Sequence, residues 1–394
     1  MKRRLIVLFL ALLLALTLVP VKAAASNSIS SFSLTHNPQE GIVFILGNKQ
    51  LTVTNLPDTT AFSSVMVNIL NQNGSSVLKK TLKRDADGSV SLALNRLGNG
   101  CHYVELFFYV GSKIYNSYIY GDDLGFIWNK STGAGEFIRP AALEHNIKIY
   151  ENARSDSAAL AYYLKQTDSI QSTSADIVKL ALEITNGIAG DYSKAYAIHR
   201  WVCENIWYDW EWTTSGIGVN ADAESALKNR RTICVGFSNL TAALLRASGI
   251  PAKVISGTSK TDPWTNNLLS GDVNHFWNEA YIDGRWVIID ATWDSANDYR
   301  GDMKTTSEGL YFNRYFDATI EAFSIDHYIE AYSEDSIAAA PEEPPPQVPE
   351  EPLSQALKQA DPPVSWIAPG MTWFSQNAGL PWKRTRLRFN EDVI

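Results

Sequence analysis

The chain has 394 residues, a formal net charge of −8 and only three cysteines. An acidic chain of this kind lacks the clustered Lys and Arg that phosphate binding requires, so we expect no nucleic-acid partner. Three cysteines are too few for a fold built on disulfides, and the odd number leaves at least one thiol free. The length is ample for two domains with substantial cores.

Residues 1–25 have the pattern of a secretory signal peptide. A basic start precedes an apolar run from Leu5 to Val19, and alanines follow at 23–25. The run is shorter than the ~20 residues of a membrane-spanning helix, although an uncleaved anchor remains the alternative. Cleavage would remove four basic residues and take the net charge from −8 to −12. We therefore expect a secreted or cell-surface protein that has no stable membrane insertion after cleavage.

Residues 27–125 are predicted to form an all-β domain. Short runs rich in β-branched and aromatic residues alternate with turn signals, as at 64–70. The clearest strand is 102–111, where every second residue from Val104 to Val110 is apolar and shares one face. Strands at this spacing favour an immunoglobulin-like sandwich. No residue pattern in this domain indicates catalysis.

Helical patterns follow in residues 139–335, the second predicted domain. Apolar residues at helical spacing predict a long helix over 191–210. This helix carries His199, which we expect to be structural or on the surface, and Cys203, which we expect to pack in the core. A disulfide between Cys203 and Cys101 across the two domains remains an open alternative.

Two further segments complete the predicted organisation. Residues 338–363 hold eight of the sixteen prolines, interleaved with glutamates, which predicts an extended, solvated linker. Residues 364–394 are too few for an independent core, and we assign them as a short tail of unknown structure.

The cysteine at position 234 stands where a helix is predicted to begin. An apolar stripe follows it in "CVGFSNLTAALLRASGIP", and Gly249 and Pro251 signal the end of a helix over about 234–248. A lone cysteine is more often a buried packing residue. In the first turn, however, unpaired N–H groups and the positive end of the helix dipole stabilise a thiolate, which suits a nucleophile. Gly236 would let another group approach closely.

A base and an acid are predicted on a hairpin further along the chain. Asp283-Gly284 is a strong two-residue turn signal between alternating runs. Continued pairing would place Trp277 opposite Asp290, so that His275 and Asp290 are diagonal neighbours on one side, about 7–8 Å apart. Asp294 lies on the same face and is the second choice for the acid.

These residues predict a nucleophilic site in which each has a stated role. Cys234 attacks a carbonyl carbon, His275 accepts the thiol proton, and Asp290 orients the imidazole. The backbone N–H of Cys234 would form half of an oxyanion hole. Trp207 and Tyr208 are the candidates for the second donor.

Two stretches, "RRTICVGFSNLTAALLRASGIPAKVISG" and "HFWNEAYIDGRWVIIDATWD", resemble the core of the transglutaminase-like superfamily. The resemblance covers about residues 170–300. It implies a papain-like α+β fold, with the cysteine helix packed on a small antiparallel sheet, and thiol-based acyl transfer on amides. Some members cross-link glutamine to lysine, others hydrolyse amides, and some have lost the triad and only bind. Phe276 and Ala291 depart from the family's usual Ala and Pro.

We therefore expect an exported cysteine-dependent acyl transferase or peptidase that acts on protein, peptide or cell-wall amides. Hydrolysis is favoured over cross-linking, because no feature selects an amine over water. The alternative is a non-catalytic surface binding or adhesion module. We expect no cofactor and no metal: zinc spacing is absent, and the oxygen-rich segment 294–302 is predicted to be a solvated loop rather than a Ca²⁺ site. Eight tryptophans fall between 201 and 293, where we expect an aromatic core, with a substrate cleft as the alternative. The sequence does not determine the oligomeric state.

Overall fold

The structure is a computed structural model that describes residues 29–37, 41–56, 64–110, 113–152, 157–215, 220–260, 273–295, 297–301, 303–305 and 313–332. The predicted signal peptide, the Pro/Glu-rich linker and the tail lie outside these residues. Within the described part of the chain, no helix has both the length and the apolar character needed to cross a bilayer.

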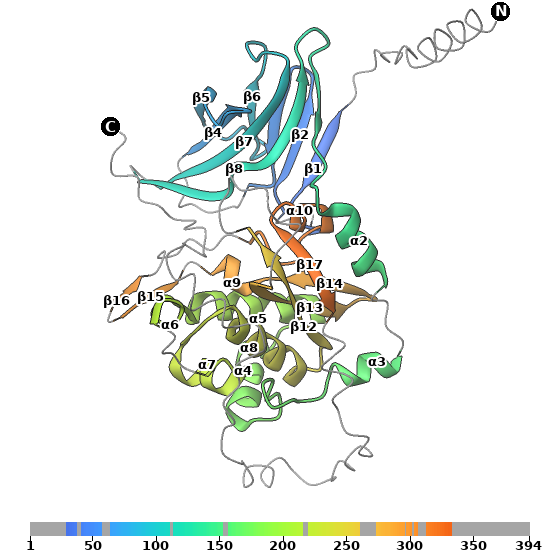
Figure 1. The fold of residues 1–394 in the computed structure, drawn as a ribbon, viewed down its shortest axis with the longest axis vertical. Helices are drawn as coiled ribbons and strands as arrows, with labels where there is room; N and C mark the ends of the chain where they lie inside the picture. The colour runs from blue at the N-terminus through green and yellow to red at the C-terminus, as the bar shows by residue number, and fades with distance from the viewer. Residues whose placement is uncertain are drawn as a thin grey trace, which may run out of the picture.

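The N-terminal part consists of two antiparallel sheets (blue to teal in Figure 1). The first sheet has the strand order β1-β2-β3-β6 and the second has the order β5-β4-β7-β8-β9. Their strands are β1 (Ser30–Ser33), β2 (Val43–Gly47), β3 (Gln50–Thr54), β4 (Ser64–Asn71), β5 (Ser76–Leu82), β6 (Val90–Ala93), β7 (Gly100–Val110), β8 (Lys113–Asn129) and β9 (Ala134–Phe137). Alternate residues of both sheets enter one buried hydrophobic cluster, so the two sheets share a core.

The β structure continues to Phe137, past the predicted boundary at 125. Strand β8 runs on to Asn129, whose side-chain oxygen accepts hydrogen bonds from the N–H groups of Ser131 and Thr132 at 3.0 and 3.2 Å. Gly133 completes this turn at a φ of 69°, and β9 then returns along β8. The sequence prediction ended the domain early because the alternation of apolar residues is broken inside β8 by Gly121-Asp-Asp.

The second part mixes helices with two further sheets, of order β14-β13-β12-β17 and β11-β10-β15-β16. Its helices are α2 (Leu143–Asn152), α3 (Ser157–Tyr162), α4 (Ala175–Thr185), α5 (Asp191–Asn205), α6 (Trp210–Ser215), α7 (Ala223–Asn229), α8 (Cys234–Ala247), α9 (Ala291–Asp294) and α10 (Ile320–Phe323). Its strands are β10 (Trp207–Asp209), β11 (Arg231–Thr232), β12 (Ala252–Ser259), β13 (His275–Ile282), β14 (Arg285–Ile289), β15 (Asp298–Arg300), β16 (Met303–Thr305) and β17 (His327–Tyr332).

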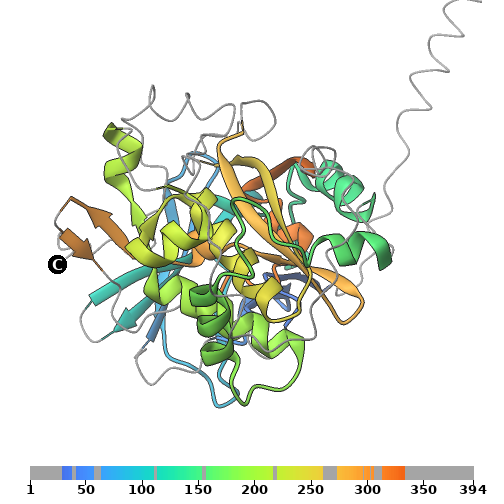
Figure 2. The ribbon, with the colours of Figure 1, turned by 90° about the horizontal axis from the view of Figure 1, so that it is seen from below.

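The sheet β14-β13-β12-β17 is buried on both faces. Figure 2 shows the yellow and green helices grouped beside the orange hairpin, with α2 on the far side. Ala280 and Val287 belong to the hydrophobic cluster that includes α8. Trp277 and Ile288 stand an odd number of residues from Ala280 and Val287 in their strands, and they belong to the cluster on the other face, which α2 covers. The sheet therefore separates two cores, as the period of two along a strand requires.

The predicted helix over 191–210 is shorter in the structure. Helix α5 ends at Asn205, and residues 207–209 form β10. The N–H of Trp207 donates to Arg230 O at 2.9 Å, and that of Tyr208 donates to Asn297 O at 2.9 Å. Partners far along the chain therefore override the local helical pattern, which single-segment periodicity cannot show.

The two parts are joined through the segment that holds α10. Thr319 donates its N–H to Leu34 O at 3.0 Å and its hydroxyl to Ser33 O at 2.9 Å. Ala322 and Ile325 enter the core between the N-terminal sheets, while Phe323 lies in the cluster beneath the hairpin β13-β14. One short helix thus contributes side chains to both cores.

Candidate active site

Cys234 is the first residue of α8, as the sequence predicts, and its side chain is buried, with 1 % of the residue exposed. A Cβ at Gly236 would meet Thr232 Oγ1 at 1.9 Å, so the glycine admits the strand that precedes the helix. Within α8 the Cys234 N–H has no carbonyl partner, because the residue four positions earlier lies outside the helix. These features hold the thiol at the positive end of the helix dipole.

His275 connects Cys234 to Asp290. Its Nε2 lies 2.7 Å from Asp290 Oδ2. Cys234 is among the groups that raise the pKa of His275, so its thiol lies close to the imidazole. Because ionised Asp290 can only accept, Nε2 carries a proton, which leaves the other ring nitrogen to act as a base toward the thiol. The structure therefore brings the three predicted residues into one buried group.

Electrostatics favour the charged forms in this group. Burial lowers the pKa of His275, but Asp290 and Cys234 outweigh that effect and the pKa lies above its ordinary value. For Asp290 burial acts in the opposite direction and raises the pKa of the carboxyl group. His275 and His327 more than offset this effect, and the pKa of Asp290 is held well below its usual range. An ionised Asp290 thus stabilises an imidazolium at His275.

Asp290 reaches His275 by a route that differs from the predicted hairpin ladder. The pairing of β13 with β14 ends at Asn278 and Ile289, so Trp277 does not pair with Asp290. Asp290 is instead the N-cap of the short helix α9, where its Oδ1 accepts from Trp293 N at 3.0 Å. Its own N–H donates to Tyr315 O at 2.9 Å. The cap leaves Oδ2 for the imidazole.

Asp294, the second choice for the acid, serves a different histidine. Its Oδ2 lies 2.9 Å from His199 Nε2, and both side chains are fully buried. Its two carboxylate oxygens also accept the N–H groups of Arg314 and Tyr315 at 3.1 and 2.9 Å. His199 is therefore a buried structural residue, in agreement with one of the two readings of the sequence.

Cys203 lies beside this second histidine, but its geometry does not suit a nucleophile. Its Sγ is 3.7 Å from Nε2 and 3.9 Å from Nδ1 of His199, so it sits against the ring rather than in line with one nitrogen. It also lies in the last turns of α5, where the helix dipole disfavours a thiolate. Cys203 packs in the core as predicted, and all three cysteines are free, so the disulfide with Cys101 does not form.

The predicted solvated loop at 294–302 is wrong for the residues that the structure describes there. Residues 298–300 form β15, which pairs in parallel with β10. Asp298 accepts from Trp210 Nε1 at 3.1 Å, and Asp294 has the partners given above. Parallel pairing with a strand ninety residues earlier leaves no local signal in the sequence.

The tryptophans of this region are chiefly core residues, as expected. Trp210, Trp277, Trp286 and Trp293 are buried. Trp277 and Trp293 nevertheless also form walls of the site, because their rings lie 6.0 and 5.7 Å from the ring of His275. Trp277 and Trp293 therefore both pack in the core and position the His275 side chain.

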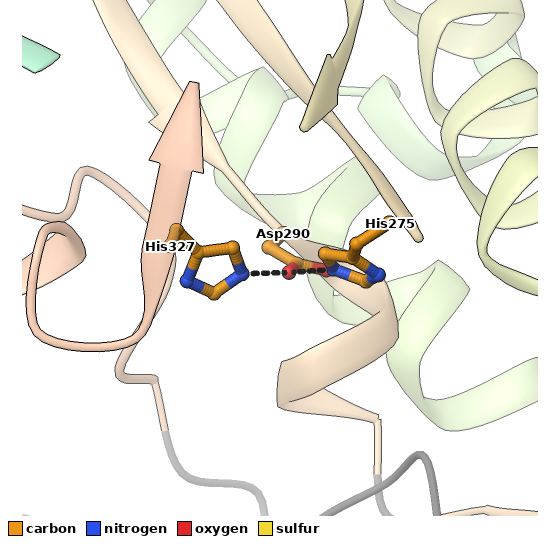
Figure 3. A group of neighbouring side chains, drawn as sticks. All are labelled: His275, Asp290 and His327. Atoms are coloured by element: carbon orange, nitrogen blue, oxygen red, sulfur yellow. Dashed lines mark hydrogen bonds and ion pairs between the residues drawn. The ribbon is translucent and has the colours of Figure 1, made fainter. Parts of the chain in front are cut away.

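A residue that the sequence analysis missed, His327, completes the group (Figure 3). It is the first residue of β17, and its Nε2 lies 3.2 Å from the same Asp290 Oδ2 that faces His275. Its Nδ1 lies 2.7 Å from Oδ1 of Asp326. No motif marks His327, because it comes from a strand 37 residues beyond Asp290.

The ligand atoms of His275, Asp290 and His327 lie within 4.8 Å of one another, a set that by residue type could hold a metal ion. Both imidazole Nε2 atoms, however, approach one carboxylate oxygen at hydrogen-bonding distance, as the dashed lines in Figure 3 show. Protonated nitrogens that already bond to the carboxylate are not available as metal ligands. We therefore interpret the group as a hydrogen-bonded chain.

Comparisons with known proteins agree with this geometry. The family model of the transglutaminase-like superfamily matches residues 178–291, which include Cys234, His275 and Asp290. The kyphoscoliosis peptidases of mouse and human are 28% and 29% identical over 152 and 140 residues, which are 38% and 35% of this chain. These stretches span only 22% and 21% of the two relatives.

Two solved structures are also similar, at low TM-scores. The periplasmic domain of TgpA from Pseudomonas aeruginosa is 14% identical, with a TM-score of 0.29, over 59% of this chain and 88% of that chain. Red sea bream transglutaminase is 10% identical, with a TM-score of 0.27, over 76% of this chain and 54% of that chain. Residues 178–291 of this chain are therefore a segment of transglutaminase-like type.

Proposed function

We propose that this protein is a thiol enzyme that forms a thioester between Cys234 and the acyl group of a peptide or side-chain amide. The observation that carries the proposal is the buried Cys234–His275–Asp290 group, with the thiol at a helix start and His275 Nε2 2.7 Å from Asp290. A thiol beside a base, with the base held by an orienting acid, is the arrangement that nucleophilic catalysis needs.

The proposed reaction has two steps. Cys234 Sγ bonds to the carbonyl carbon while His275 takes the thiol proton, and the tetrahedral intermediate collapses as His275 returns the proton to the departing amine. Water or an amine then attacks the thioester, again with His275 as the base, and Cys234 regains its proton. Hydrolysis with water is our first choice, and the peptidase names of the two curated relatives support it.

The oxyanion of the intermediate needs two donors. The Cys234 N–H is one, and we assign the Tyr208 hydroxyl as the second. Burial raises the pKa of Tyr208 well above its ordinary value, and the charge of a Cys234 thiolate raises it further, which indicates that the two groups are close. A phenol that stays protonated remains a donor. Trp207, the other candidate, has a buried Nε1 with no hydrogen-bond partner among the described residues.

Location and finer fold follow as proposals from the sequence. We infer export from the signal-peptide pattern at 1–25 and a papain-like arrangement from α8 packed on the β13-β14 sheet. We also infer an immunoglobulin-like character for the two N-terminal sheets. Peptide or cell-wall amides at the cell surface are the substrates that these assignments favour, with no nucleic-acid partner.

The experiment compares wild type, Cys234→Ala and Cys203→Ala on a protein substrate and a peptidoglycan digest, with a labelled amine present. Product masses separate hydrolysis from amine transfer. Iodoacetamide at about pH 6 should label Cys234 faster than an ordinary thiol. Cys203→Ala, which removes a buried thiol outside the site, should keep both activity and labelling. An unreactive Cys234 together with no product would favour the non-catalytic binding module.

A further inference from the structure

The imidazole of His327 is held in one orientation by burial and by three aromatic neighbours. It is fully buried. Its ring stacks on Phe323, with 4.0 Å between ring centroids and 14° between planes, and it lies 4.7 Å from the ring of Trp293 and 5.4 Å from that of Tyr315. These rings fix the orientation of the imidazole, so that its two nitrogens point in set directions.

Both of those directions end at a carboxylate. Nδ1 is 2.7 Å from Asp326 Oδ1, and Nε2 is 3.2 Å from Asp290 Oδ2. An ionised carboxylate only accepts hydrogen bonds, and a neutral imidazole has only one N–H. Both contacts are satisfied together only when His327 carries two protons and a positive charge.

The chain of contacts continues away from the thiol. Asp326 Oδ2 accepts from Arg314 Nη2 at 2.7 Å and from the Tyr315 hydroxyl at 2.5 Å. Arg314 Nη1 lies 3.6 Å from Asp123 Oδ2, and Asp123 belongs to β8 of the N-terminal sheets. Charges alternate along this line, so each member is neutralised by its neighbours.

We propose that His327 is a positioning residue of the active site, held as an imidazolium between Asp290 and Asp326, which keeps Asp290 ionised and aimed at His275. The proposal rests on the proposed function only for its effect on catalysis. The protonation state of His327 does not depend on that function, because it is a property of the folded protein.

The charged neighbours determine the sign of the effect. Four titratable groups surround His327. They are Asp290 at the N-cap of α9, His275 in β13, Asp326 directly before β17, and the Tyr315 phenol in the segment before α10. Arg314 and Asp123 act through Asp326. Burial lowers the pKa of His327, but Asp326 and Asp290 outweigh it and the pKa lies above its ordinary value. Removing this cation should raise the pKa of His275 and should make a thiolate at Cys234 less favourable.

The first test is ¹⁵N NMR of labelled histidines, of which the chain has six. The His327 signals are identified by their loss in His327→Gln. We expect both nitrogens to remain protonated at pH values well above the ordinary histidine value of ~6.5. In Asp326→Asn, which keeps an acceptor for Nδ1 but loses the charge, His327 should lose a proton at least about one pH unit lower.

The second test follows the rate of Cys234 alkylation by iodoacetamide against pH. We expect His327→Gln to move the midpoint upward by about half to one pH unit. The matched control is His199→Gln, which removes an equally buried histidine paired with Asp294 and should leave the midpoint unchanged. Should His327→Gln fail to fold, Asp326→Asn and the NMR titration carry the test.

Two results would overturn the proposal: a His327 that loses a proton near ~6.5, or a midpoint that is the same in His327→Gln and His199→Gln. Failure of the proposed function looks different, since Cys234 in the wild type would then react no faster than an ordinary thiol while the state of His327 could still be read by NMR.

Discussion

At the scale of single residues, Asp290 is the centre of the site. One of its oxygens caps α9 through Trp293 N, and the other faces His275 and His327 at 2.7 and 3.2 Å. A fully buried carboxylate is unfavourable unless its charge is compensated. Here a backbone N–H and two imidazoles provide that compensation, so the carboxylate that faces His275 is itself fixed in ionisation state and direction.

This arrangement predicts how the stability of the protein depends on pH. The pKa of Asp290 lies below the unfolded-state value of ~3.9, so its contribution to stability is complete above about pH 4 and is lost as the pH falls through the folded-state pKa. Asp290→Asn should lower the free energy of unfolding at neutral pH, by about 3 kcal/mol, and should make it depend less steeply on pH below about 4. Urea unfolding at a series of pH values measures both.

Asp85→Asn is the control, because Asp85 is an exposed residue of a turn in the N-terminal sheets. It should change the free energy of unfolding by no more than about 0.5 kcal/mol. The dependence of that free energy on pH should stay as in the wild type. Equal slopes for wild type and Asp290→Asn would contradict the assignment of Asp290 as an ionised, compensated group.

At the scale of elements, α8 and the strand before it meet at Gly236. A Cβ there would lie 1.9 Å from Thr232 Oγ1 and 2.7 Å from its Cβ. Gly236→Ala should therefore destabilise the protein by about 1–3 kcal/mol, even though alanine favours helix by ~1 kcal/mol. Thermal unfolding measures the loss, and alkylation of Cys234 reports whether the start of the helix has moved.

Two variants sharpen this prediction. Thr232→Ala combined with Gly236→Ala should recover part of the loss, because the hydroxyl and methyl that obstruct the new Cβ are removed. Gly98→Ala, at a glycine with no atom within 4 Å of an added Cβ, should have little effect. A Gly236→Ala protein as stable as the wild type would show that Thr232 moves aside without cost.

The elements that the sequence predicted well are those with local signals. The helix expected over about 234–248 is Cys234–Ala247 in the structure, and the turn at Asp283-Gly284 joins β13 to β14. The elements that were missed, β10, β15 and α9, depend on distant partners or on one capping side chain. The same distinction applies to the site: His275 and Asp290 stand at the two ends of one hairpin segment, whereas His327 belongs to β17.

At the scale of the whole molecule, the two cores are connected through α10. Ile325 lies in the core between the N-terminal sheets, with 5 % exposed. Ile325→Ala should lower the free energy of unfolding by about 2–4 kcal/mol. It should also keep a single transition, because the segment that it anchors supports Asp326 and His327. Tryptophan fluorescence and far-UV circular dichroism followed in the same urea titration measure both.

Ile127→Ala is the matched control, since Ile127 lies on β8 with 58 % exposed. It should cost no more than about 0.5 kcal/mol. Two separate transitions in Ile325→Ala, with the part that holds α8 unaffected, would show that the two cores are independent.

The position of α10 in the chain has a consequence for biosynthesis. The N-terminal sheets end at Phe137, yet their core is completed by Ala322 and Ile325, and His327 lies two residues after Ile325. A ribosome therefore releases both sheets long before their last core side chains exist. The last core residues of the N-terminal sheets and His327, the last contact of Asp290, are therefore synthesised within a few residues of each other. From the synthesis of Cys234 until that point, the nascent chain carries this thiol without its complete surroundings.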